Sequence, residues 1–230
     1  QPFEEIITDA QKHGFAESDP TLDIDGWDSK FKLILTNYHA FGILNRPEDI
    51  LNLGIRHIKP EDIEFAKDND YSLKLIGHSQ LKDGKFEAYV APQLIPKTAS
   101  ITSIDFENNA VELNAEFAHQ QLLQGKGAGS FPTASAVLSD VVSLLKDYTY
   151  TYPKALNTSE TKPSLDTSSL IKIYVSAYKR EYLESFSFHT EILEGNQKQL
   201  QYKIGKISLS DLHQTLKNLT TNVFIAVFSE

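Results

Sequence analysis

The sequence predicts an α/β (α+β) protein: a mixed β-sheet with helices on one face, followed by a small βα module. Three observations support this fold class. Apolar residues recur with a helical period in residues 3–13 and 26–41. Two strand-like runs flank the turn "KDGK" at residues 82–85. After Tyr150 the composition becomes rich in Ser, Thr and Pro, and a second set of strand and helix patterns follows.

The overall composition narrows the classes of function. With 230 residues, 40% of them hydrophobic, the chain is long enough for a sizeable core. A net charge of -9 without a basic block argues against nucleic acid and against anionic membrane surfaces as partners. There is no cysteine, and the seven histidines show no ligand spacing, so we expect no metal site. Because neither a membrane-length apolar run nor a signal peptide is present, we expect a cytoplasmic protein.

The helix over residues 26–41 has the clearest pattern. Its apolar residues recur every three to four positions, and Gly42 is placed to end it. Asp25 is placed to cap its first turn, with Asp28 three residues further on. The predicted apolar stripe consists of Trp27, Phe31, Ile34, Leu35, Tyr38 and Phe41.

The patterns divide the chain into three parts. Residues 1–150 hold the predicted sheet, its helices and a glycine-rich loop. Residues 151–168 have the composition of a linker. Residues 169–230 show the strand, hairpin, helix and strand patterns of a small module.

The stretch "GFAESDPTLDIDGWDSKFK", residues 14–32, crowds carboxylates beside two lysines. Helix starts attract acids in any protein, so capping alone is one explanation. A functional one is that Asp28 and Lys32, four residues apart, share a helix face at the edge of the apolar stripe, whereas Lys30 falls on the other flank. A partly buried lysine oriented by a carboxylate can exchange a proton with a hydroxyl group. Carboxylates nearby would suit a substrate that carries an ammonium group.

The loop "GKGAGS" has glycines at 125, 127 and 129, but Ser130 stands where a G-x-G-x-x-G motif needs its third glycine. It is either a tight loop before a helix or a place where backbone N–H groups approach an anionic or polar ligand.

The acidic stretch and its surroundings resemble the homoserine dehydrogenase family. The family pattern "AQ-x-x-G-[YF]-x-E-x-D-P-x-x-D-[ILV]-x-G-x-D-x-x-x-K" fits residues 10–32. Downstream, "GIRHIKPEDIEFA" resembles the family's "GI-x-x-[IV]-x-x-x-DI-x-x-A", and "GKGAGSFPTASAVLSD" is close to "G-x-GAG-x-x-PTA-x-AV-x-x-D". The motifs follow in the family's order from about residue 3 to residue 145, which is a specific signal.

The resemblance implies an enzyme that interconverts L-homoserine and L-aspartate 4-semialdehyde with NADP or NAD, in threonine, methionine and isoleucine biosynthesis. Lys32 resembles the catalytic proton donor and acceptor at the substrate's 4-oxygen. Asp28 and Glu17 resemble substrate ligands, Asp28 also belonging to the catalytic pair. Asp23 is a supporting carboxylate, and Phe15 lies on the substrate side.

Further expectations follow from the same resemblance. Gly127, Ala128 and Gly129 are placed near the nicotinamide end of the cofactor, and Gly14 where the substrate-side loop meets it. The fold implied for residues 1–150 is similar to the second domain of glyceraldehyde-3-phosphate-type dehydrogenases, with a sheet that also builds a homodimer. The module at residues 169–230 has the size of an ACT domain, although "VSAYKREYLE" lacks that fold's ligand-loop glycine.

Two alternatives remain open. The chain could be a non-catalytic module that binds an amino acid, or a dehydrogenase for another amino-acid aldehyde. The family's N-terminal Rossmann domain, with its G-x-G-x-x-G motif and second catalytic lysine, has no counterpart in these 230 residues.

We therefore predict that residues 1–230 alone show no homoserine-dependent reduction of NADP⁺, because most of the cofactor-binding surface is missing. Absorbance at the NADPH band, followed with saturating L-homoserine, checks this. Robust turnover by the isolated chain would contradict it.

Overall fold

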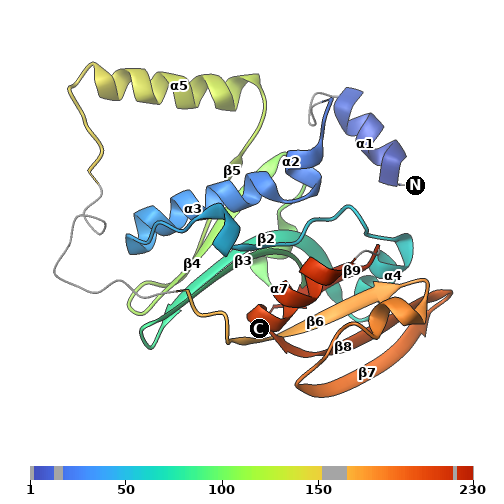
Figure 1. The fold of residues 1–230 in the computed structure, drawn as a ribbon. Helices are drawn as coiled ribbons and strands as arrows, with labels where there is room; N and C mark the ends of the chain where they lie inside the picture. Colours follow the sequence, from blue (N-terminus) through green and yellow to red (C-terminus); the bar gives the residue numbers. More distant parts are fainter. Residues whose placement is uncertain (1–2, 13–17, 152–164, 220–221, 230) are drawn as a thin grey trace.

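The computed structural model describes residues 3–12, 18–151, 165–219 and 222–229 (Figure 1). The predicted succession of helices and strands is confirmed, while the expected helix end at Gly14 and most of the linker lie outside the described residues. Among the described helices, none has the length and apolar character needed to cross a membrane. The helices are α1 (Phe3–Lys12), α2 (Thr21–Ile24), α3 (Trp27–Phe41), α4 (Pro60–Asp68), α5 (Ser130–Leu144) and α7 (Leu209–Asn218), with short 3-10 helices η1 (Pro47–Asp49), η2 (Ser100–Ser103) and η3 (Arg180–Leu183). The strands are β1 (Leu51–Asn52), β2 (Tyr71–Lys82), β3 (Lys85–Pro96), β4 (Asn108–Ala115), β5 (His119–Lys126), β6 (Leu170–Ala177), β7 (Thr190–Gln197), β8 (Leu200–Ser208) and β9 (Phe224–Phe228).

Strand β3 is an interior strand, second from one edge of a seven-stranded mixed sheet. One edge pairs with β2 over its whole length, through a hairpin turn in which Asp83 and Gly84 have positive φ angles. The other edge is shared by β1 and then β9, both parallel to β3. The path of the sheet is β1-β3-β9-β6-β8-β7, so the last strand of the chain lies in its middle.

Pro92 lies inside strand β3 without breaking the sheet. The carbonyls of Val90 and Leu94 accept hydrogen bonds from Leu53 and Ser229 on the β1/β9 edge, so Pro92 faces the same edge. Pairing with β1 is registered at Tyr89 and Val90 and pairing with β9 begins at Gln93. The missing N–H of Pro92 therefore falls where the edge changes partners.

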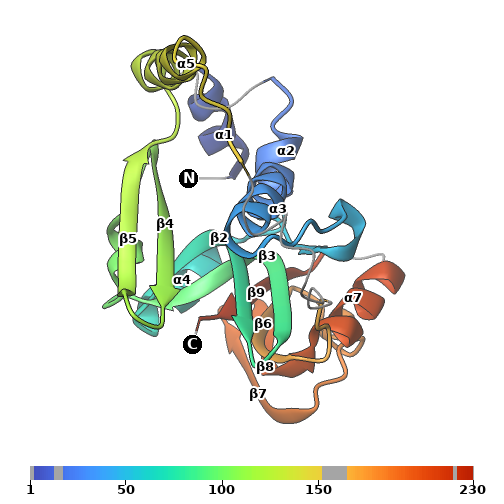
Figure 2. The same ribbon diagram turned by 90° about the vertical axis from the view of Figure 1, so that its left-hand side faces the viewer.

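Helices cover both faces of the shared sheet (Figure 2). Within residues 1–150, α3 and α4 pack on one face: α3 contacts Phe86, Ala88 and Val90, and α4 lies over β2, β6 and β9. Helix α7 and η3 cover the opposite face, where Ile173, Val175 and Ile225 belong to the largest core cluster. The predicted arrangement with helices on one face thus holds for the N-terminal part, and the C-terminal part adds the second layer.

The C-terminal segment has the topology β6–η3–β7–β8–α7–β9 with the strand order β9-β6-β8-β7. That is the order of a βαββαβ module whose first helix is shortened to the four residues of η3. Because β9 pairs with β3 and β6 pairs with β9, the module and the N-terminal part share one sheet.

A buried carboxylate joins these two parts. Asp62 of α4 is 1% exposed and accepts hydrogen bonds from the hydroxyls of Tyr174 (2.9 Å) and Ser176 (2.6 Å) on β6, and from the backbone N–H of Lys59 (2.8 Å). Burial raises the pKa of Asp62, and the hydrogen bonds oppose that shift. Beside it, the ring of Phe65 stacks on Tyr174, with centroids 4.5 Å apart.

The packing of α3 differs from the predicted stripe. Leu33 and Ile34 are buried, but Trp27 is 37%, Phe31 44% and Leu35 60% exposed. Lys30, expected on the other flank of the stripe from Lys32, is 3% exposed, and its ammonium lies 4.3 Å from the centroid of the Trp27 ring. Burial lowers the pKa of Lys30, and the charge of Glu48 opposes the shift. The stripe prediction was wrong here because a lysine can bury its aliphatic stem and place its charge on an aromatic face.

Asp62→Ala should lower the free energy of unfolding by about 3 kcal/mol, because three buried donors lose their acceptor at once. Urea unfolding followed by circular dichroism measures this. The matched control is Asp68→Ala on the same helix, whose exposed hydrogen bond to Gln197 should be worth less than about 0.5 kcal/mol. Equal losses in the two variants would show that the buried network does not hold the two parts together.

Lys30→Met should leave the protein at least as stable as the wild type at pH 7. Since the pKa of Lys30 is lowered in the folded state, the unfolded chain binds more protons between that value and its ordinary value of about 10.4. Wild-type stability therefore rises with pH in this window, and any advantage of the methionine variant shrinks. Urea unfolding at pH 7, 8.5 and 10 tests the trend, with the exposed Lys67→Met as the matched surface control.

Candidate functional site

The predicted catalytic pair is formed on α3. Lys32 Nζ lies 2.7 Å from Asp28 Oδ2, one helical turn away. The Lys32 side chain is 65% exposed and that of Asp28 43% exposed. The expected partial burial of Lys32 is therefore wrong for the described chain, since the buried lysine of this helix is Lys30. The pair lies on the open side of the helix, where a substrate can reach both groups.

The first turn of α3 is not capped as predicted. Gly26, with φ of 76°, occupies the N-cap, and no side chain accepts a hydrogen bond from the first turn. The Asp25 carboxylate instead receives a fork of two hydrogen bonds from Arg56: Nε to Oδ1 at 2.7 Å and Nη2 to Oδ2 at 2.9 Å. Local capping rules could not reveal this partner, because it lies 31 residues further along the chain.

The other acids of the stretch surround the same helix start. Asp23 is exposed on α2, the short helix directly before Gly26. Asp19 accepts a hydrogen bond from the backbone N–H of Thr21 at 3.1 Å, and its hydrogen bonds to Thr21 lower the pKa of its carboxyl. The predicted site residues Gly14, Phe15 and Glu17 lie outside the described residues.

The glycine loop leads from β5 into α5. Gly127 donates its N–H to the Glu107 carbonyl at 3.0 Å, and a Cβ there would lie 1.8 Å from Asn109 Nδ2. Gly129 has φ of 113° and precedes a helix whose first turn receives no side-chain cap. An open groove of about 790 Å³ follows this helix start, lined by Gly129, Ser130, Thr133, Ala134, Val137 and Leu138. Uncapped N–H groups beside a groove can receive an anionic or polar ligand.

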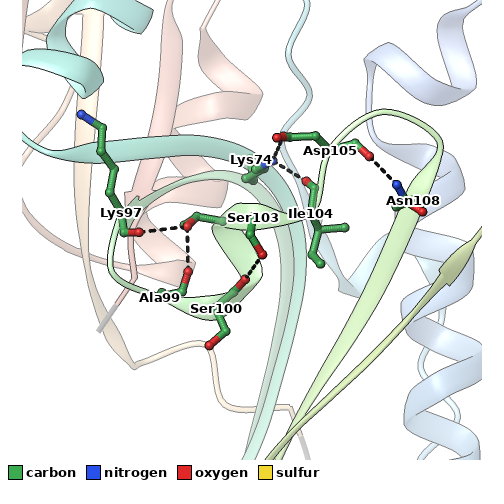
Figure 3. Close-up of polar contacts among 9 residues, drawn as sticks. Lys74, Lys97, Ala99, Ser100, Ser103, Ile104, Asp105 and Asn108 are labelled. Atoms are coloured by element: carbon green, nitrogen blue, oxygen red, sulfur yellow. Dashed lines mark hydrogen bonds and ion pairs between the residues drawn. The ribbon is translucent and has the colours of Figure 1, made fainter.

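A polar cluster anchors the hairpin that carries this loop (Figure 3). Lys74 of β2 donates to the Ile104 carbonyl at 2.5 Å and to Asp105 Oδ1 at 2.6 Å. Asn108, the first residue of β4, donates to the Asp105 carbonyl at 3.0 Å. At the same open end of the hairpin, Lys126 of β5 pairs with Glu107 at 2.8 Å. The base of the hairpin is thereby tied to the central sheet through β2.

The structure thus brings Asp28 and Lys32 into contact on α3, and Asp23 lies on α2, directly before this helix. Helix α5 runs above α3 in both views (Figures 1 and 2), and both helices begin on the same side of the molecule. Within the described part of the chain, no hydrogen bond or ion pair links Gly127, Ala128 or Gly129 to the pair on α3. None of the residues of α5 is buried.

The part of the chain that holds the motifs is similar in sequence to known proteins. A sequence model of the homoserine dehydrogenase family matches residues 1–142. The homoserine dehydrogenase of Bacillus subtilis (strain 168) is 39% identical over 146 residues, which make up 64% of this chain and 34% of that enzyme. That of Helicobacter pylori is 38% identical over 144 residues, or 63% and 34% of the two chains. The chain spans about a third of the length of the curated relatives it matches.

Solved structures extend the likeness to the whole chain. A homoserine dehydrogenase from Thiobacillus denitrificans has a TM-score of 0.74 at 25% identity, covering 99% of this chain and 58% of that one. The homoserine dehydrogenase of S. aureus at pH 7.0 has a TM-score of 0.69 at 26% identity, covering 100% and 60%. With the family pattern matched over residues 1–142 and the fold shared throughout, this chain belongs to the homoserine dehydrogenase family.

Proposed function

We propose that this chain is the catalytic part of a homoserine dehydrogenase that interconverts L-homoserine and L-aspartate 4-semialdehyde. The observation that carries the proposal is the exposed Asp28–Lys32 pair, 2.7 Å apart, at the family positions for substrate ligand and proton exchange. Glu17 and Asp23 would receive the substrate's ammonium group together with Asp28, and Phe15 would lie beside them. The acidic residues of the stretch 14–32 would then serve substrate binding as well as helix structure.

The chemistry needs one hydride and one proton. A bound NADP or NAD would supply the acceptor for the hydride from carbon 4 of homoserine, and the hydride donor in the reverse direction. In the oxidation, Lys32 accepts the proton of the 4-hydroxyl as the carbon–oxygen double bond forms; in the reduction, it gives that proton back. Asp28 holds the lysine Nζ in place through both directions, because its carboxylate stays within hydrogen-bond distance on the neighbouring turn.

The glycine loop would lie near the nicotinamide end of such a cofactor. Gly127, Ala128 and Gly129 precede the uncapped first turn of α5, and the groove beside it is lined by small side chains. Gly14 would complete this contact from the substrate side. Most of the cofactor would be held by a nucleotide-binding domain of the kind that the family resemblance implies, which would also cover the exposed faces of the site and exclude water from it.

The division of the chain into parts, its oligomeric state and its location belong to the same proposal. Residues 1–150 form the catalytic and dimerisation part, residues 151–168 a linker and residues 169–230 an ACT-like module, which the βαββαβ strand order supports. A homodimer is supported by apolar side chains exposed on the β4–β5 hairpin: Val111, Leu113 and Leu123. We place the protein in the cytoplasm.

The test uses an assay protein in which residues 1–230 follow the nucleotide-binding part of the Bacillus subtilis relative. Lys32→Ala in this protein should lower kcat for homoserine oxidation by at least about 100-fold, because the proton acceptor is lost. Calorimetric affinity for L-homoserine should stay within about threefold, since Lys32 acts mainly in the transition state. The control is Lys67→Ala, an exposed lysine on α4. Wild-type turnover by the Lys32 variant would remove it as the acid and base.

A substrate panel separates the remaining alternative. If another amino-acid aldehyde were reduced with a higher kcat/KM than L-aspartate 4-semialdehyde, the chain would be a dehydrogenase of different specificity. We expect the 4-semialdehyde to be preferred.

A further inference from the structure

The segment that follows β1 is fastened to the turn between α2 and α3. The Ile55 N–H donates to the Ile24 carbonyl at 2.7 Å, and Asn52 Nδ2 donates to the Asp25 carbonyl at 2.8 Å. Gly54 lies so close that a Cβ there would be 2.3 Å from the Ile24 carbonyl oxygen. The backbones of the two segments are therefore in direct contact just before the start of α3.

Arg56 completes this attachment with its side chain. Its fork on Asp25 uses both carboxylate oxygens, the geometry in which an arginine–carboxylate pair is most directional. Asp25 is 30% and Arg56 46% exposed at the side chain, so the pair is partly shielded from solvent. The hydrogen bond to Asp25, and to a smaller extent the charge of Asp25, also raise the pKa of Arg56.

The position of this pair matters for the site. Asp23 lies two residues before Asp25, and Asp28 lies three residues after it. Between them, Gly26 adopts a left-handed conformation and the helix start has no side-chain cap. Because α2 has only four residues, its position relative to α3 depends on the contacts that Asn52, Ile55 and Arg56 make with it.

Neither residue of the pair stands at a fixed position of the family pattern. In the family pattern, residue 25 stands at the open position of "D-[ILV]-x-G-x-D", and residue 56 at an open position of "GI-x-x-[IV]". The neighbouring positions Asp23, Gly26, Asp28, Gly54 and Ile55 are fixed by the pattern. Arg56 and Asp25 thus add a link that the shared motifs do not require.

We propose that Arg56, through its fork on Asp25, is a positioning residue that fixes the spacing of the Asp23 and Asp28 carboxylates for the substrate's ammonium group. The proposal rests on the proposed function. Arg56 also compensates the charge of Asp25, so that this carboxylate does not compete with its neighbours for the substrate. Arg56 itself touches neither the substrate nor the cofactor in this arrangement.

The kinetic test is a double-mutant cycle in the assay protein with Arg56→Gln, Asp25→Asn and the two combined. Each single change should raise KM for L-homoserine by about 5- to 20-fold and change kcat by less than about twofold, because misplaced ligands weaken binding. The double variant should be no worse than either single one, because both remove the same link. Arg56→Lys, which keeps the charge but loses the fork, should fall between wild type and Arg56→Gln.

The matched control is Arg180→Gln. Arg180 is 61% exposed and pairs with Glu184 and Glu194 in the C-terminal segment, on the part of the sheet away from α3. It should leave KM unchanged even if it lowers the melting temperature as much as Arg56→Gln does. An unchanged KM in Arg56→Gln, additive effects in the cycle, or an equal rise of KM in Arg180→Gln would overturn the proposal.

A second readout needs no turnover and uses the 230-residue chain itself. Hydrogen exchange in residues 18–30, followed by mass spectrometry, should be about tenfold faster in Arg56→Gln and unchanged in Arg180→Gln. Unchanged exchange in Arg56→Gln would also overturn the proposal. The Lys32→Ala variant tests the proposed function separately. If Lys32→Ala loses activity while Arg56→Gln keeps the wild-type KM, the positioning role of Arg56 is wrong and the proposed function stands.

Discussion

The pairing of β3 on both of its edges is the constraint on which the rest of the structure depends. Residues 88–95 of this strand are all buried, so each backbone group there needs a partner within the protein. β2 supplies partners along one edge, and β1 and β9 supply them in turn along the other. Residues 1–150, which hold the candidate site, and the C-terminal segment therefore pair on the same strand. Pro92 lies in this strand at the point where the edge changes partners, so its missing N–H leaves no partner unsatisfied.

The candidate site depends on this strand through short links. β1 pairs with β3, and the segment after β1 holds the turn before α3, so the acids and Lys32 are fixed relative to the sheet within a few residues. From the other side, α4 reaches β6 through the buried Asp62 carboxylate. A displacement of α4 relative to β6 would break these hydrogen bonds and leave the Asp62 carboxylate buried without its donors.

Much of the fold could be predicted from local patterns, and the errors have physical causes. The turn at Asp83 and Gly84, the helix end at Gly42 and the strand Leu170–Ala177 follow from turn chemistry and period alone. The buried face of α3 could not be predicted in this way, because Lys30 buries its aliphatic stem while the side chains of Phe31 and Leu35 are exposed. The Asp28–Lys32 pair could be predicted from helical spacing, whereas the partner of Asp25 is distant in sequence and local rules assigned it to a cap. The only sign of this partner in the sequence is Arg56, a single arginine two residues after Gly54 of the family pattern.

The place of β9 has a consequence for how the chain is made. Val227 pairs with Gln93 across 134 positions, and the same strand separates β3 from β6. Until β9 has been synthesised and paired, β3 and β6 each present an unpaired edge, of the kind that invites pairing with other chains. A nascent or truncated product that lacks β9 is therefore the form of this protein most exposed to such pairing.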